Sequence, residues 1–132
     1  MAIMSVILGA KMNLRREKLI KLCIAALLKD IVLVSSKVEK NIKYAYKQHP
    51  ILGYEYLKKN YSLDEEILLA ILHDHEQFDG LGYPNKLEDE EISSFARIIS
   101  IVYSFYEIKI NHIMLDKNQI LFEENLKKFK RV

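Results

Sequence analysis

The densest group of residues able to do chemistry is His73 to Pro84, which reads His-Asp-His-Glu-Gln-Phe-Asp-Gly-Leu-Gly-Tyr-Pro. Imidazole nitrogens and carboxylate oxygens are the usual ligands of catalytic transition metals. Gly80 and Gly82 predict a tight turn, because glycine adopts backbone conformations that strain other residues. This turn is not a dinucleotide-binding fingerprint, since no third glycine follows at the required spacing. A metal site beside a tight turn is therefore the first hypothesis.

Two earlier segments carry residues of the same types. Asp30 ends the apolar run Ala-Ala-Leu-Leu-Lys-Asp, and His49 is followed by Pro50. Proline fits the first turn of a helix, where no amide hydrogen is needed. We therefore expect His49 to sit at a helix entrance with its side chain free to reach a site.

Helices must position these residues, because apolar residues recur at three- and four-residue spacing and strand-like alternation is absent. Asn13 is predicted to cap the first long helix. Ser62 is predicted to cap the helix before His75, with Glu65 completing a capping box. His73 lies about 200° from His75 around a helix, so we expect it to face solvent or an interface.

Composition indicates one folded domain. The chain has 132 residues, 50% of them hydrophobic, and no low-complexity tract, which suffices for one hydrophobic core. The net charge of +2 is too small to imply nucleic acid. No apolar stretch approaches the ~20 residues of a membrane span, and Met1 to Ala10 lacks a secretory leader. We expect a cytoplasmic protein without nucleic-acid or membrane contact. Residues 35–48 are predicted to form a polar connector or one more helix through Ile42, Ala45 and Tyr46.

The stretch from Asp74 to Pro84 resembles the HD-GYP family, bacterial metal-dependent phosphodiesterases of cyclic di-GMP. The positions that match its motif are Asp74, His75, Glu76, Asp79, Gly80, Gly82, Tyr83 and Pro84. Residues 25–33 are similar to the family's first metal motif, Ala-Ala-Leu-Leu-His-Asp-Ile-Gly-Lys. His49-Pro50 matches its His-Pro, and Arg97 lies in an Ala-Arg-Ile match.

The resemblance covers roughly 14–105 and leaves a divergent helical segment at 108–132. It implies an all-α fold, a single HD-domain-like bundle of about five or six helices over 1–132.

Several family ligands are changed in this chain. Lys29 stands where the family has a histidine, and Tyr103 where it has an aspartate; Leu33 replaces a lysine. A protonated lysine has no lone pair and adds positive charge where a metal would sit. The resemblance implies a remnant metal site that holds at most one iron, manganese or zinc ion and has no assigned catalytic residue. Its ligands would be Asp30, His49, Asp74 and His75.

Three functions remain open. The favoured one is a degenerate domain that no longer hydrolyses cyclic di-GMP. It would bind a partner protein or the dinucleotide through the turn residues Glu76, Asp79, Gly80, Gly82, Tyr83 and Pro84, with Arg97. The second is an active phosphodiesterase in which Asp74 and Glu107 substitute for the missing ligands. The third is a purely structural helical module.

For Asp30, pairing with a nearby lysine is the alternative to metal ligation.

Overall fold

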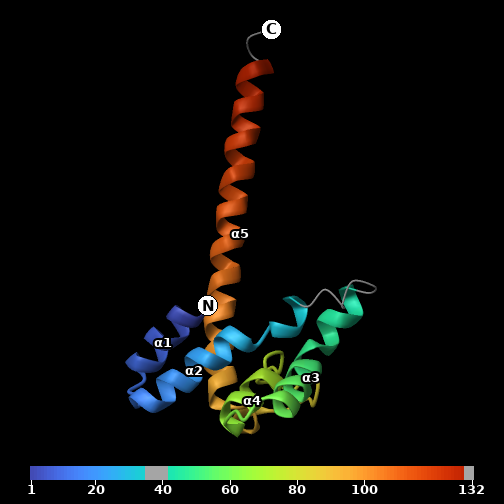
Figure 1. The fold of residues 1–132 in the computed structure, drawn as a ribbon. Coiled ribbons are helices and arrows are strands. Elements are labelled where there is room, and N and C mark those ends of the chain that lie inside the picture. The colour runs from blue at the N-terminus through green and yellow to red at the C-terminus, as the bar shows by residue number, and fades with distance from the viewer. Residues whose placement is uncertain (35–41, 130–132) are drawn as a thin grey trace. The chain divides into compact units, whose positions relative to one another are not determined.

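A computed structural model describes residues 1–34 and 42–129, with side chains left out at 42–45 and beyond 113. The elements in chain order are α1 (Ala2–Lys11), α2 (Arg16–Leu28), the 3-10 helix η1 (Ile31–Val34), α3 (Ile42–Asn60), α4 (Glu65–Leu72), the 3-10 helix η3 (Asp89–Glu91) and α5 (Ser94–Phe129) (Figure 1). Within these ranges the only β pairing is one isolated bridge between Asp79 and Glu88. The predicted all-α fold is confirmed.

The chain divides into two compact units, Met1–Val102 and Tyr103–Val132. In the first unit α2 packs against α1 and α4, and α4 packs against α3. The amphipathic faces of these helices bury Leu22 and Ile71 completely, and Ile99, from the part of α5 in this unit, is 1% exposed. Replacing any of the three by alanine would cost about 2–5 kcal/mol. The core therefore fixes the ends of α2 and α4, from which the site residues project.

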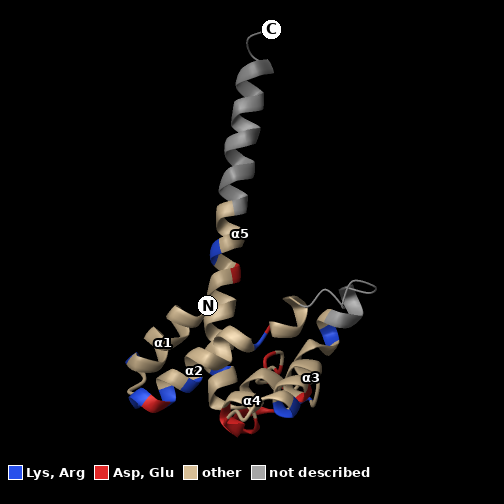
Figure 2. Ribbon diagram, viewed as in Figure 1, with Lys and Arg blue, Asp and Glu red and all other residues tan. Residues whose placement is uncertain are grey.

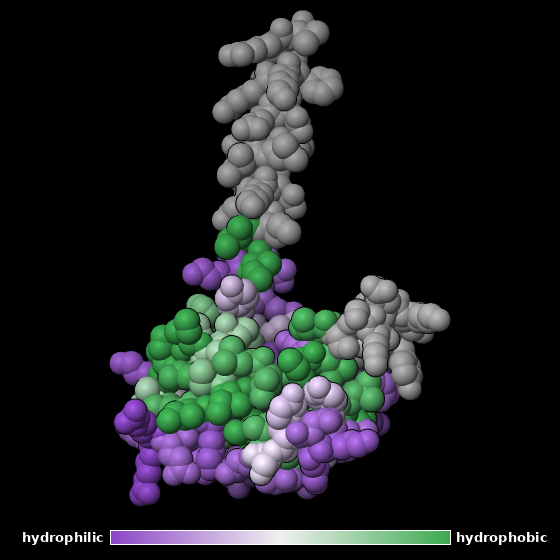
Figure 3. Space-filling view, viewed as in Figure 1, coloured by the Kyte–Doolittle hydropathy of each residue, from purple (hydrophilic) through white to green (hydrophobic). Residues whose placement is uncertain are grey.

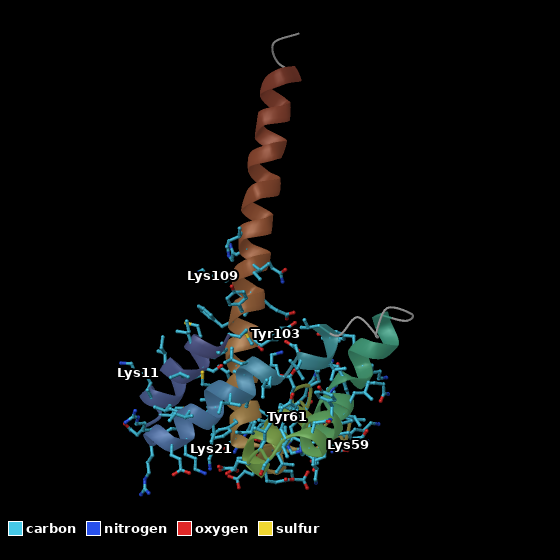
Figure 4. The ribbon with its side chains drawn as sticks, in the orientation of Figure 1. Lys11, Lys21, Lys59, Tyr61, Tyr103 and Lys109 are labelled. Atoms are coloured by element: carbon cyan, nitrogen blue, oxygen red, sulfur yellow. The ribbon has the colours of Figure 1, made fainter. Side chains whose placement is uncertain are left out.

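Opposite charges join α2 to the start of α4 at the surface. Lys21 Nζ lies 2.8 Å from Asp64 Oδ2 and 3.3 Å from Glu66 Oε2, and Lys18 also pairs with Glu66. Figure 2 shows basic residues along α2 and acidic residues near α4. Figure 4 labels Lys21 on α2. The neighbouring ammonium groups lower the pKa of both carboxyl groups. These exposed contacts weaken as the salt concentration rises. They therefore contribute to the orientation of the helices more than to the free energy of unfolding.

Two predicted helix caps are wrong. Asn13 does not open a helix: it follows α1 with φ 61°, a left-handed conformation that asparagine tolerates, and α2 starts at Arg16. Ser62 does not cap α4, because the side chain of Asp64 accepts the backbone N–H of Glu66 at 3.1 Å instead. At α4 a second capping residue, Asp64, lay two positions after Ser62, and sequence alone could not choose between them. The N-cap of α2 is Arg15, whose side chain makes no cap hydrogen bond.

The predicted helix entrance at His49 is also wrong. Pro50 lies inside α3, which already runs from Ile42. The first part of the predicted connector, 35–41, lies outside the described residues, and the remainder belongs to α3.

Apolar residues also reach the surface of the first unit, where Figure 3 shows them gathered over α1 and α2. The large exposed ones there include Ile3, Ile7, Ile20 and Leu27. Among the described residues, no helix is both long enough and apolar enough to cross a membrane.

The second unit is the remainder of α5. Its side chains from 103 to 113 are all exposed. Tyr103 donates a hydrogen bond from its hydroxyl to Glu107 Oε1, one turn later, at 2.7 Å; Figure 4 labels Tyr103 and Lys109 on this helix. Tyr103 and Glu107, the altered aspartate position and its suggested substitute, thus pair with each other.

Candidate metal centre

Two helix ends and one helix interior bring the predicted ligands together. Asp30 follows the C-cap of α2, His49 lies within α3, and Asp74 and His75 follow the end of α4. Because α4 packs against both α2 and α3, these segments converge although they are far apart in sequence.

The donor set has the chemistry of a single metal site. His49, Asp74 and His75 each offer one ligand atom, and these atoms lie within 4.8 Å of one another. The Nε2 atoms of His49 and His75 are buried without a hydrogen-bond partner. Buried polar atoms are rarely left unsatisfied, and imidazole with carboxylate suits zinc, iron or manganese. The residues therefore fit one ion.

A lysine ammonium lies against the same carboxylates. Lys29 Nζ is 2.8 Å from Asp30 Oδ2 and 3.3 Å from Asp74 Oδ2, and the residue is only 6% exposed. Burial lowers the pKa of Lys29, but the charges of Asp74 and Asp30 outweigh it and raise that pKa. Lys29 is therefore charged, and it already neutralises the carboxylates that a metal would need.

The two histidines differ in charge. Burial lowers the pKa of His49, but Asp30, Asp74 and the Tyr46 carbonyl outweigh it and raise that pKa to about 9. The contact with His49, at 3.4 Å from Nε2 to Oδ1, and then that with Lys29 hold the pKa of Asp30 at about 2. Burial lowers the pKa of His75. At neutral pH, without a metal, His49 is charged and His75 is neutral.

The turn after His75 supports its ring. Gly80 has φ 75°, and a Cβ on Gly82 would lie 2.3 Å from Gln77 N and 2.5 Å from His75 O. Tyr83 donates its N–H to His75 O at 3.1 Å, and its ring stacks on the His75 imidazole. The glycines thus let the chain fold back closely enough for Tyr83 to cover His75.

Glu76 anchors the loop after the turn. Its Oε1 accepts the N–H of Asn85 at 2.6 Å, and its Oε2 accepts that of Leu87 at 3.0 Å. The residue is 4% exposed. Asp79 Oδ1 similarly accepts the N–H of Leu81 at 3.0 Å. Two predicted binding residues therefore hold the backbone of their own loop.

The predicted solvent-facing position of His73 is wrong. The residue is 7% exposed, and its Nδ1 accepts the N–H of Ser93 at 3.0 Å. The angle between His73 and His75 was derived for a continuous helix, but α4 ends at Leu72 and His73 is its C-cap. The backbone leaves the helix there and carries His73 into the protein.

Arg97 lies apart from the donor group. It lines an apolar pocket of about 540 Å³ together with Phe78, Ile92 and Ile101.

Sequence reasoning missed Tyr46, whose ring lies 5.4 Å from that of His75 and whose carbonyl contacts His49. Its position four residues before Pro50 was the available signal.

A protein-family model described as HD domain matches residues 2–127. The chain belongs to this family, and the family resemblance predicted from the motifs is confirmed.

Two curated proteins are similar to the chain. Cyclic di-GMP phosphodiesterase PdeB of Borreliella burgdorferi is 32% identical over 125 residues, covering 88% of the chain and 31% of the relative. Cyclic di-GMP phosphodiesterase response regulator RpfG of Xanthomonas campestris pv. campestris is 35% identical over 78 residues, covering 58% of the chain and 20% of the relative. The chain therefore spans about a third or less of these relatives.

Proposed function

We propose that this domain acts in cytoplasmic cyclic-dinucleotide signalling without hydrolysing the dinucleotide, and that it binds a partner protein. The observation that carries the proposal is the contact of the Lys29 ammonium with both Asp30 and Asp74. The similarity to two cyclic di-GMP phosphodiesterases supports a role in signalling by this dinucleotide.

The contacts of Lys29 argue against a hydrolytic centre. Metal-dependent phosphodiester hydrolysis by a two-metal site uses ions about 3.5–4 Å apart that activate water and stabilise the leaving oxygen. Here the described donors suffice for one ion, held by His49, Asp74 and His75. Such an ion would supply Lewis-acid chemistry, but Asp74 could ligate it fully only by giving up its contact with Lys29.

The turn offers a surface for a partner protein. Phe78 is 67% exposed and Leu81 is 78% exposed, although both are large apolar residues. The turn that carries them is held by the Asp79 carboxylate, which accepts the N–H of Leu81, and by the close approach of Gly82 to its neighbours. A preordered apolar pair of this kind loses little conformational entropy on binding, which favours a protein interface.

Hydrolysis of cyclic di-GMP with added Mn²⁺ or Fe²⁺ tests the proposal. We expect no product from the native protein or from Lys29→His alone. The triple variant Lys29→His, Asp74→His, Tyr103→Asp should bind more metal than the native protein. Robust native turnover that His75→Ala abolishes would overturn the proposal.

Partner binding has its own test. A double variant, Phe78→Ser with Leu81→Ser, should lose a partner captured from the cells that make this protein, while Tyr61→Ser, exposed beyond the end of α3 (Figure 4), should retain it. Equal capture by both variants would argue against the turn as the interface.

The alternative is an active phosphodiesterase with an unconventional metal set. The buried Nε2 atoms of His49 and His75, neither of which meets the criteria for a hydrogen bond, favour it. Metal analysis by mass spectrometry after purification without chelator separates the two functions. We expect at most one weakly held ion per chain, and two tightly bound ions would support the active enzyme.

A further inference from the structure

The interior of α3 contains a proline, and this leaves one carbonyl without its helical partner. In an α-helix the N–H of residue i bonds the carbonyl of residue i−4. Pro50 has no N–H, so the carbonyl of Tyr46 receives no such bond. Both residues lie within Ile42–Asn60, which is helical on either side of this position.

His49 makes use of that carbonyl. Its Nδ1 lies 2.5 Å from Tyr46 O. A carbonyl oxygen can only accept, so Nδ1 must carry the proton of the contact. When the ring is neutral, its lone pair is therefore on Nε2, the buried atom that lies 3.4 Å from Asp30 Oδ1 and 3.7 Å from Asp74 Oδ2.

We infer that Pro50 is a positioning residue for His49. By leaving the Tyr46 carbonyl available, it fixes the Nδ1–H tautomer and the orientation of the ring, so that Nε2 is presented to Asp74 and His75. Metal-binding histidines are commonly oriented by a hydrogen bond from the other ring nitrogen to a carbonyl or carboxylate. The inference goes beyond the proposed function, because it concerns the presentation of His49 whether or not the site hydrolyses anything.

Pro50→Ala separates positioning from stability. Alanine is the best helix former and proline the worst, but the Pro50 side chain is fully buried and its truncation leaves a cavity, so these two effects on the unfolding temperature oppose each other. The new N–H of the variant would compete with His49 for Tyr46 O, and the ring would lose its fixed tautomer. A purely structural proline would change stability and leave the imidazole as it is.

Two measurements test it. Two-bond proton–nitrogen NMR spectra of ¹⁵N-histidine-labelled protein, recorded above the His49 pKa of about 9, should show Nδ1–H for His49 in the native protein. Pro50→Ala should show a mixture of tautomers or Nε2–H. His49→Gln assigns the signal, and Lys47→Ala, an exposed change in the same helix, should leave it unchanged.

The second measurement is Zn²⁺ titration in a Lys29→Met background, which removes the competing ammonium. Adding Pro50→Ala should weaken Zn²⁺ binding by about tenfold or more, as loss of an orienting hydrogen bond does elsewhere. Pro50→Ser, which also restores the N–H, should behave in the same way. A native-like Nδ1–H signal together with unchanged Zn²⁺ affinity in both proline variants would overturn the inference.

Discussion

The imidazole of His75 lies nearly parallel to the phenol ring of Tyr83, with ring centroids 4.9 Å apart and an interplanar angle of 12°. Tyr83 lies eight positions after His75 in the sequence. The chain can place Tyr83 over His75 only because the backbone at Gly82 passes directly against that of His75 and Gln77. The turn thus supports the ring of His75, a candidate metal ligand, and is also an exposed loop.

Gly82→Ala should be among the most damaging single substitutions. Its Cβ would lie 2.3–2.5 Å from backbone atoms, which cannot move away as a flexible side chain can. We expect a loss of ~3 kcal/mol or more in unfolding free energy, at the upper end for single changes, measured by urea denaturation. Gly53→Ala is the control: its Cβ would meet two side-chain methyl groups, Ile71 Cγ2 at 3.3 Å and Val32 Cγ2 at 3.8 Å, and the change should stay within about 1 kcal/mol. Equal effects would contradict this view of the turn.

Lys29→Met should destabilise the metal-free protein and favour metal binding. Removing one partner of a buried ion pair leaves an uncompensated charge and typically costs about 3–5 kcal/mol. Added Zn²⁺ should then raise the unfolding temperature of the variant more than that of the native protein, because ligand binding stabilises the folded state. Lys47→Met, at an exposed position, serves as the control. A variant that gains no Zn²⁺ response would show that Lys29 does not compete with a metal.

Glu76→Gln should loosen the loop after the turn. The amide retains one acceptor oxygen and places donors where the N–H of Asn85 or Leu87 now donates. An unsatisfied buried group costs about 1–3 kcal/mol. Amide hydrogen exchange at Asn85 and Leu87 should accelerate, while Glu55→Gln, an exposed change in α3, should leave their protection intact. Unchanged protection in Glu76→Gln would mean that the loop is held by other contacts.

His73 should contribute an acid-sensitive part of the stability. Burial lowers its pKa below the ordinary 6.5, against the opposing charge of Glu76, and protonation at Nδ1 would break its bond from Ser93. The unfolded chain then binds the proton first, so this stability is present above pH 6.5 and is lost as the pH falls below it.

The slope of unfolding free energy against pH measures this contribution. His73→Asn should have a flatter slope below pH 6.5 than the native protein, although His75 retains part of the slope because burial also lowers its pKa. His112→Asn, an exposed change, should keep the native slope. A native-like slope in His73→Asn would remove His73 as the cause.

The helical fold could be predicted because the apolar spacing that favours helices also forms the core. Leu68 and Ile71, three residues apart in the helix predicted before His75, are both buried in α4. Helix ends were harder. Capping residues are common near every helix start, and the choice of Asp64 over Ser62 depends on where α4 meets α2, where Lys21 pairs with Asp64.

The site was predictable in residue type but less so in geometry. The motifs predicted that Asp30, His49, Asp74 and His75 belong together, and the structure places them in contact. The contact of Lys29 with Asp74, 45 residues away, depends on the packing of α2 against α4. The burial of His73 depends on a helix that ends one residue before it. The spacing of residues in the local sequence predicts neither of these tertiary contacts.

The ammonium of Lys29 differs from a metal ion in that it is part of the chain. It cannot be removed by a chelator, exchanged for another ion or lost when metals are scarce. Asp30 and Asp74 therefore keep a counter-charge whatever the metal content of the cell, whereas domains that fold around a bound metal lose their structure without it. A signalling domain built in this way would present the same surface in metal-starved and metal-replete cells, and its response would depend on its partner alone.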